Sequence, residues 1–372
     1  MSFLTLVIKN LLRRRSRSLL TVIGIAIGIA AVVSLTGLAW GFETSLTNIF
    51  RARGTDLIVT KAKSHGAIPG AFPEKIREDL RAMPQVEKSA GILCEVFSVE
   101  DSSSTLVVGW EADSPLWAHL KLVNGSWLQG DAPGQIMLGQ LLADALGKKP
   151  GDAVQVETGE FSVAGIFSST AVTENGAIVM RLEDMQRLTN RPGLVNFIDV
   201  WLKPDTSARD REEIQAAIHS QFKDLKAFGP GGLSQQSTAV QLAKGMGICT
   251  SLLAVIIGAV GVTNTILMSV FERLQEIGVL LALGWKRRRI LKMILMESLL
   301  LSILGGVFGV LLGVVAAHIL EAMPFIHGKF ETEITAPLLG VGMLVALVLG
   351  TLGGLYPAWI GSRMSPANAL RQ

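Results

Sequence analysis

Four long apolar stretches constrain the fold of this chain more than any other feature of its sequence. They cover residues 19–45, 244–271, 290–320 and 336–361. A helix needs about 20 predominantly apolar residues to cross the hydrocarbon core of a bilayer, and each stretch is long enough. The sequence therefore predicts an integral membrane protein with four transmembrane α-helices.

Basic residues beside these stretches predict the orientation of the chain in the membrane. Arginines gather at residues 13–17, a second cluster runs from Lys286 to Arg289, and Arg363 and Arg371 follow the last stretch. Short cytoplasmic loops are enriched in Lys and Arg, and four crossings place all three clusters on one side. We therefore expect both termini in the cytoplasm.

The segments between the apolar stretches follow from this orientation. Residues 1–18 are a cytoplasmic segment, either an amphipathic helix on the membrane surface or only a charge cluster that sets the topology. Residues 272–289 form a cytoplasmic elbow, residues 321–335 an outer loop and residues 362–372 a cytoplasmic tail.

The long segment 46–243 is expected outside the membrane as an α+β domain, and its length suits either one full domain or two interlocked subdomains. Short alternating strands are predicted at 56–61 and 86–99, a hairpin at 153–167 and a helix at 208–223. Because strands and helices follow one another without a regular βαβ repeat, a doubly wound sheet is not expected.

Chemical groups in this outer segment give little indication of catalysis. His65 has no companion at ligand spacing, and Cys94 on an alternating strand is typical of a small buried residue. Trp110, Trp117 and Trp127 either line a surface for an apolar ligand or belong to the core. The sequence thus predicts no catalytic residue, no cofactor-binding residue and no metal site.

Charge excludes further classes of function. The net charge is close to balance at +3, which gives no support for nucleic-acid binding. The apolar stretches contain few charges, which argues against an ion path. In the third stretch, Glu297 lies about two helical turns from Arg289, so it is either interfacial or paired with the basic cluster.

The elbow 272–289 carries the main candidate site. Leu274, Ile277, Gly278 and Leu281 recur at helical spacing, which indicates a short amphipathic helix that offers a lever to a soluble partner. The residues predicted to contact or position that partner are Glu272, Arg273, Glu276, Ile277, Gly278 and Gly284. The alternative is that Glu272 and Glu276 only favour the helix N-terminus and form local ion pairs.

Glycines in the apolar stretches predict close contacts between helices. Small residues at regular spacing let helix backbones approach one another within a membrane. The predicted packing positions are Gly24, Gly28, Gly258, Gly261, Gly305 and Gly309.

Two motifs and the order of the segments carry a resemblance to a known family. The run Glu-Arg-Leu-Gln-Glu-Ile-Gly at 272–278 is followed by Ala-Leu-Gly at 282–284, and Tyr-Pro-Ala at 356–358 leads to Ser365-Pro366. With one span, a large outer domain and three further spans, the chain resembles the MacB-type (FtsX-like) permeases of ATP-binding cassette (ABC) transporters over nearly its whole length.

The resemblance implies partners and a location. It implies an ABC ATPase at the cytoplasmic face, which carries ATP and Mg²⁺, and a second permease copy in a homodimer within the lipid of a bacterial cytoplasmic (inner) membrane. It leaves open a periplasmic adaptor and an outer-membrane duct. It also implies an inserted subdomain at about residues 110–180. The sequence has no Walker-type Gly-Lys-Ser/Thr motif, so the ATPase is expected on a separate subunit and this chain is not expected to be an enzyme.

Two functions follow from the resemblance. The first is a permease that turns ATP hydrolysis into movement of the outer domain and thereby exports or extracts an amphiphile. The second is a transmitter of signal or force that controls a periplasmic hydrolase or sensor without moving a substrate.

Overall fold

The computed structural model describes residues 15–62, 68–100, 103–128, 133–236, 238–323 and 332–363. The predictions for residues 1–14, for His65, for most of the outer loop and for the tail with Ser365-Pro366 lie outside the described residues. The chain divides into two compact units. The membrane unit comprises residues 1–39, 244–320 and 332–372, and the outer unit comprises residues 40–243 and 321–331.

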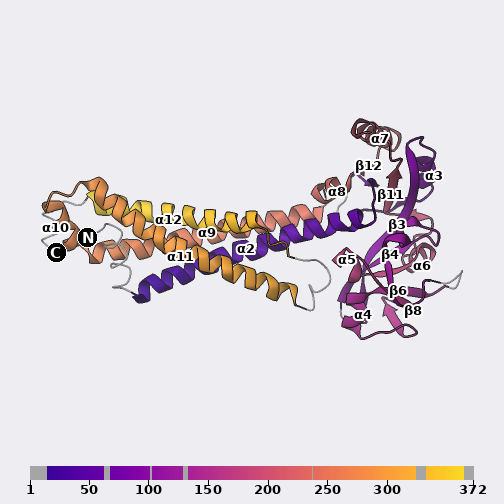
Figure 1. Cartoon of the computed structure of the whole chain (residues 1–372), viewed down its shortest axis with the longest axis horizontal. Helices are drawn as coiled ribbons and strands as arrows, with labels where there is room; N and C mark the ends of the chain where they lie inside the picture. Colours follow the sequence, from indigo (N-terminus) through magenta and orange to yellow (C-terminus); the bar gives the residue numbers. More distant parts are fainter. Residues whose placement is uncertain are drawn as a thin grey trace. The chain divides into compact units, whose positions relative to one another are not determined.

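In the part of the chain that the structure describes, four long helices are apolar enough to cross a membrane, as the composition predicts (Figure 1). Their bounds are α2 Arg15–Ala52, α9 Thr238–Glu272, α11 Arg287–Glu321 and α12 Ala336–Arg363. Helix α2 continues past its apolar stretch, so its last turns belong to the outer unit. Each segment satisfies its backbone hydrogen bonds internally, which is what a helix in lipid requires.

Glycines of α11 bring this helix against α2. A Cβ atom at Gly305 would lie 2.7 Å from Ile25 Cβ, and one at Gly309 would lie 2.6 Å from Ile29 Cβ. Both separations are shorter than real Cβ contacts, so the absence of a side chain is what permits the approach.

The other predicted packing glycines have looser surroundings. The Cβ position of Gly258 lies 3.3 Å from the Leu349 side chain, and that of Gly28 lies 3.7 Å from the Ala254 carbonyl oxygen. Among the described residues, no heavy atom beyond the local backbone lies within 4 Å of the Cβ positions of Gly24 and Gly261. A packing role for these two glycines stays a prediction.

Helices α11 and α12 are joined by a polar contact as well as by glycine. Ser298 Oγ donates a hydrogen bond of 2.6 Å to the Gly350 carbonyl oxygen, and Ser298 itself is fully buried. Gly350 and Gly354 leave room for the serine side chains of α11. A hydroxyl that bonds to a neighbouring helix fixes their register where lipid offers no alternative partner.

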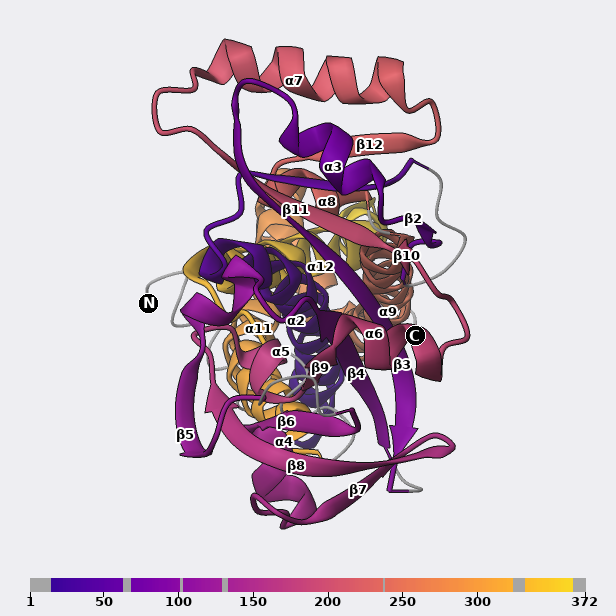
Figure 2. The same cartoon turned by 90° about the vertical axis from the view of Figure 1, so that its right-hand side faces the viewer.

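The outer unit is built on a mixed sheet of ten described strands (Figure 2). The strand order is β12-β1-β11-β3-β4-β9-β6-β8-β5, and β7 pairs with β3 and β8. Pairs β4–β9 and β6–β8 are parallel, and the remaining pairs are antiparallel. The strands are β1 Leu57–Lys61, β3 Val86–Val99, β4 Ser103–Trp110, β5 Lys121–Gly125, β6 Gln135–Gly139, β7 Ala153–Val156, β8 Gly159–Ser168, β9 Ile178–Arg181, β11 Phe197–Leu202 and β12 Leu225–Phe228. A separate pair joins β2 Phe72–Pro73 to β10 Leu194–Val195.

Helices cover this sheet, so the predicted α+β class is confirmed. They are α3 Ile76–Arg81, η1 Pro115–His119, α4 Gln140–Leu146, α5 Val172–Asn175, α6 Leu182–Leu188, α7 Ala208–Gln221 and α8 Pro230–Gln236. Helix α7 packs on β12 at one edge of the sheet (Figure 2). It begins at Ser207, whose side chain and that of Asp210 form a capping box.

Strand alternation divides the core between the two faces of the sheet. On β3, Leu93 points into one cluster of buried side chains, whereas Ile92 and Cys94 point into the other. Cys94 is therefore the small buried residue that the sequence indicates, and its thiol is free. Residues 110–180 supply β5 to β9, which form one continuous half of the sheet next to β4.

Candidate functional site: the elbow and the outer junction

The predicted elbow helix is present as α10, Leu274–Ala282, between α9 and α11. Ile277 and Gly278 are buried on its inner face, as their spacing indicates. Gly284 follows the helix with a φ of +91°, a left-handed conformation that favours glycine. The chain can therefore turn sharply between α10 and α11 at this position.

An ion pair fastens the start of the elbow to α11. Arg273 Nη1 lies 3.1 Å from Glu297 Oε1 and 3.2 Å from Oε2, and the two side chains are 12% and 7% exposed. Arg273 Nε also donates to Glu276 Oε2 at 3.3 Å. Glu297 is thus paired with Arg273, while Arg289 lies over the Trp285 ring at 4.9 Å. Pairing of Glu297 with the rest of the basic cluster stays a prediction.

The opposite side of the elbow is open to solvent in the described chain. Glu272 and Glu276 are exposed, and so are Val279 and Leu283 on the same short segment. Leu283 keeps 73% of its surface. Exposed apolar side chains flanked by carboxylates are typical of a surface that another protein covers.

A second arginine lies at the outer end of α2, where the sequence indicates no site. Arg53 follows Ala52 directly, and its side chain is 5% exposed. Its Nε donates to Glu174 Oε1 at 3.0 Å, and its Nη1 lies 3.5 Å from Asp199 Oδ2. The guanidinium carbon also lies 5.3 Å from the centre of the Trp110 ring. We call Arg53 with these partners the outer junction.

Glu174 is the better stabilised carboxylate of the outer junction. His119 Nε2 lies 2.7 Å from its Oε2, and Ser169 Oγ donates to the same oxygen at 2.6 Å. Burial alone would raise the pKa of Glu174, but Arg53, His119 and Ser169 outweigh it and hold that pKa below its ordinary value. Glu174 is therefore ionised at neutral pH.

Asp199 behaves differently although it faces the same arginine. Burial raises the pKa of Asp199 above its ordinary value, and Arg53 and the hydrogen bond from Thr55 offset this only in part. The longer distance to Arg53 and the complete burial explain the difference. The guanidinium thus interacts chiefly with Glu174.

Sequence reasoning missed the outer junction because its members are far apart along the chain. Arg53 and Glu174 are separated by 121 positions. The one local signal is an arginine at the end of a long helix, and that signal also fits an ordinary surface residue.

The tryptophans of the outer unit divide between core and surface. Trp110 is 1% exposed and packs edge-on against Trp117, with 5.0 Å between ring centres. Trp117 in turn meets Trp127 at 6.2 Å, and Trp117 Nε1 donates to the Glu111 carbonyl oxygen at 2.8 Å. Trp110 is therefore core, while the other two line a hollow.

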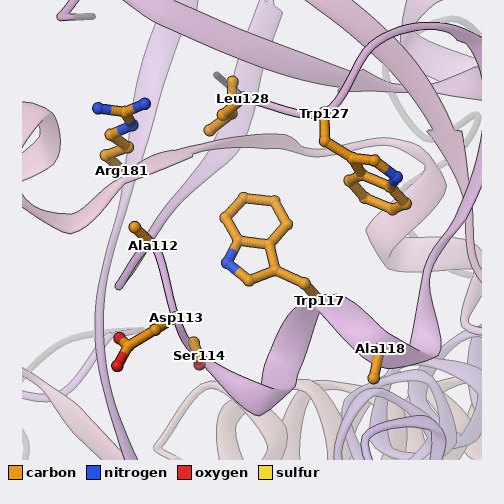
Figure 3. Close-up of a pocket in the computed structure, with 8 residues that line it drawn as sticks. All are labelled: Ala112, Asp113, Ser114, Trp117, Ala118, Trp127, Leu128 and Arg181. Carbon is orange, nitrogen blue, oxygen red and sulfur yellow. The ribbon is translucent and has the colours of Figure 1, made fainter. Parts of the chain in front are cut away.

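That hollow has a volume of about 490 Å³. In Figure 3, the Trp117 ring stands between the side chains of Arg181 and Trp127. Ala112, Asp113, Ser114, Ala118 and Leu128 complete the lining. The size and the mixture of aromatic and polar groups fit a small amphiphilic molecule.

Within the described ranges, no group of three or more His, Cys, Asp or Glu side chains is arranged to hold a metal ion.

Two family models match this arrangement. A MacB-like periplasmic core domain matches residues 18–220, and an FtsX-like permease C-terminal domain matches residues 248–366. The first match alone covers more than half of the 372 residues. The chain belongs to the MacB-type, FtsX-like permease family.

Individual relatives cover different shares of this permease. An uncharacterized ABC transporter permease of Methanocaldococcus jannaschii is 28% identical over 397 residues, which is 99% of this chain and 97% of that protein. A macrolide export ATP-binding/permease protein of Azoarcus sp. is 25% identical over 389 residues, which is 95% of this chain and 57% of that protein. The chain thus spans little more than half the length of this macrolide export relative. The periplasmic region of MacB from Actinobacillus actinomycetemcomitans aligns with a TM-score of 0.40 and 15% identity, over 50% of this chain and 94% of that one.

Membership of the family places this chain among the permeases of ABC transporters. It is a multi-pass protein of the inner membrane, and its outer domain lies between the first and second membrane helices. An ABC ATPase is the partner that the family implies.

Proposed function

We propose that this permease converts ATP hydrolysis on a separate ATPase subunit into movement of its extracytoplasmic domain, and that this movement exports or extracts an amphiphilic substrate. ATP and Mg²⁺ bind to the ATPase, and both termini of the permease lie in the cytoplasm beside it. The observation that carries the proposal is the elbow, a rigid helix that is fastened to α11 by Arg273 and Glu297 and exposed on its other side.

The exposed side of the elbow is the proposed docking surface. Glu272 and Glu276 supply negative charge, while Val279 and Leu283 supply apolar contact. A force applied there reaches α11 through the Arg273–Glu297 ion pair, because a nearly buried charge pair resists separation. Helix α11 packs on α2 at Gly305 and Gly309. Displacement of α11 therefore pushes or pulls α2, the helix that leads to the outer domain.

A second copy of the permease completes the proposed complex. The exposed apolar side chains of α9, among them Ile256, Ile257 and Val260, suit either lipid or that second copy. A periplasmic adaptor and an outer-membrane duct would extend the route in an exporter. In the alternative, the moving domain controls a periplasmic hydrolase or sensor and carries no substrate.

Charge reversal at Glu276 tests the docking surface. We expect Glu276→Lys to weaken association with the ATPase and to lower the permease-stimulated ATPase rate at least fivefold. The matched control is Glu212→Lys on α7, which reverses another exposed charge, in the outer unit. Unchanged association and turnover in Glu276→Lys would refute the docking role.

The hollow beside Trp117 supports an amphiphile as the substrate. Its aromatic walls and its polar margin match the two parts of such a molecule. A macrolide, the substrate class in the name of the Azoarcus relative, is one amphiphile of this kind.

Native mass spectrometry of the purified complex tests this assignment. We expect Trp127→Ala to reduce the amount of retained amphiphile, while Val123→Ala on β5, another exposed apolar residue, leaves it unchanged. If the wild-type complex retains no amphiphile and copurifies instead with a cell-wall hydrolase or a histidine kinase, the permease is a transmitter and not an exporter.

A further inference from the structure

The outer junction joins three parts of the outer unit at one side chain. Arg53 directly follows α2, whereas Asp199 lies on β11 and Glu174 on α5. Strand β11 lies in the half of the sheet that contains β12, β1 and β3, whereas α5 precedes β9 in the other half. Trp110, at the end of β4, lies where the two halves meet. One guanidinium therefore contacts both halves of the sheet.

We propose that Arg53 is a positioning residue that makes the outer end of α2 and both halves of the sheet a single rigid piece. This inference rests on the proposed function, because a rigid connection is what lets movement of a membrane helix reach the outer domain. It assigns that transmission to one residue.

The main chain at this point strengthens the connection. Trp201 Nε1 donates to the Arg53 carbonyl oxygen at 3.1 Å, and the Asp56 carboxylate accepts from the Leu202 backbone N–H at 2.9 Å. Thr55 Oγ1 donates to Asp199 Oδ2 at 3.1 Å. These contacts bind the residues after α2 to β11, and Asp56 also pairs with Arg211 on α7 at 3.0 Å. The Arg53 side chain adds the contact with the other half of the sheet.

Arginine suits this position for geometric reasons. Its planar guanidinium has five donors in a fixed fork, so it can bond to Glu174 and Asp199 in different directions while its faces lie near Phe50 and Trp110. Lysine has three donors on one compact charge at the end of a flexible stem, and it lacks both the planar fork that fixes two carboxylates in different directions and the flat faces that lie near the aromatic rings. A lysine would keep the charge but lose the simultaneous contact with both halves.

A rigid connection and a merely stabilising contact differ in a measurable way. A contact that only stabilises the fold lowers the unfolding midpoint but leaves distances within the folded domain sharp. A contact that holds two parts in place broadens those distances when it is lost, even where the domain stays folded.

Spin labels can measure these distances in the full permease–ATPase complex in lipid nanodiscs. One label replaces exposed Asn48 on α2, and the second replaces either Arg209 on α7 or Lys121 on β5, one in each half of the sheet. Cys249 is exposed and is changed to Ser. Cys94 can remain, because burial raises the pKa of its thiol to about 12 and so suppresses its reaction with the label.

We expect narrow distance distributions for both pairs in the parent protein, with and without ATP. In Arg53→Lys, at least one of the two distance distributions, Asn48–Lys121 or Asn48–Arg209, should broaden at least twofold. The rate of ATP hydrolysis should stay within twofold of the parent rate. Arg53→Gln should broaden both. Should Arg53→Gln fail to fold, the lysine variant decides alone. Unchanged widths in a folded Arg53→Lys protein would overturn the inference.

A separate measurement keeps this inference distinct from the proposed function. A single label at Arg209 in each permease copy reports whether ATP moves the outer domains. If ATP causes no change there, the proposed transmission fails, whereas the widths measured from Asn48 still decide whether Arg53 makes a rigid joint.

Discussion

Two arginines occupy equivalent places in this permease, each directly after a long membrane helix, but their surroundings differ. Arg53 follows α2 and contacts two carboxylates from separate elements as well as the Phe50 and Trp110 rings. Arg273 follows α9 and contacts Glu297 on α11 and Glu276 on its own short helix. A folded sheet domain encloses a guanidinium on all sides, whereas a turn between membrane helices leaves one side open. The first arrangement suits a fixed joint, and the second suits a lever that a partner can push.

The largest expected effect is the loss of Glu174. We expect Glu174→Gln to destabilise the outer domain by about 3–5 kcal/mol, because it leaves a buried guanidinium without its principal counter-charge. Asp199→Asn should cost less than about 1 kcal/mol at neutral pH, since the raised pKa of Asp199 indicates that the charge there is poorly stabilised. The measurement is the denaturant dependence of Cys94 labelling in a Cys249→Ser background. Equal losses of stability in the two variants would contradict the proposed difference between Glu174 and Asp199.

The contributions of Glu174 and Asp199 to the stability of the outer domain should also depend on pH in opposite directions. The lowered pKa of Glu174 means that its contribution to stability is full above its ordinary value of 4.5 and is lost as the pH falls through the lower folded value. The raised pKa of Asp199 means that its contribution is full below 3.8 and is lost as the pH rises through the higher folded value. Glu174→Gln should therefore remove the loss of stability at acid pH. Asp199→Asn should remove the loss of stability as the pH rises. Unfolding curves of the full chain across this range check both signs, and an unaltered pH profile in both variants would rule out the assignment.

A smaller effect is expected at the elbow. Glu297→Gln should destabilise the connection of α10 to α11 by about 1–3 kcal/mol, because Arg273 is nearly buried but keeps a second partner in Glu276. The matched control is Glu276→Gln, whose side chain is 51% exposed and whose ion pair should contribute at most about 1 kcal/mol. Hydrogen exchange of the α10 amides measures the destabilisation in both variants. Faster exchange in the control than in Glu297→Gln would reverse this ranking.

The smallest expected effect concerns the turn after α10. Gly284→Ala places a Cβ atom in a left-handed conformation, which should cost about 1–2 kcal/mol. Gly245→Ala in α9 is the control, because no neighbour lies near its Cβ position within the described chain and its φ is not left-handed. Thermal unfolding of the detergent-solubilised permease should show a lower midpoint only for Gly284→Ala. A lowered midpoint in both variants would mean that the turn conformation is not the cause.

Local patterns in the sequence were sufficient for the membrane helices and for the elbow helix, but not for every strand of the outer unit, since β5 and β12 were not predicted. The four apolar stretches predict α2, α9, α11 and α12 because helix length in a membrane follows from bilayer thickness. The spacing of Ile277 and Gly278 predicts the inner face of α10, and Gly284 predicts its end. Each of these signals lies within a few residues of the structure it specifies.

The charged contacts that give the structure its proposed mechanical properties were decided only in three dimensions. Glu297 lies closer in sequence to Arg289 than to Arg273, yet the turn at α10 brings Arg273 to it. Arg53 meets Glu174 and Asp199 only because ten strands assemble into one sheet. A sequence records which residues can carry charge, but pairing depends on direction and burial, and these exist only once distant elements have packed.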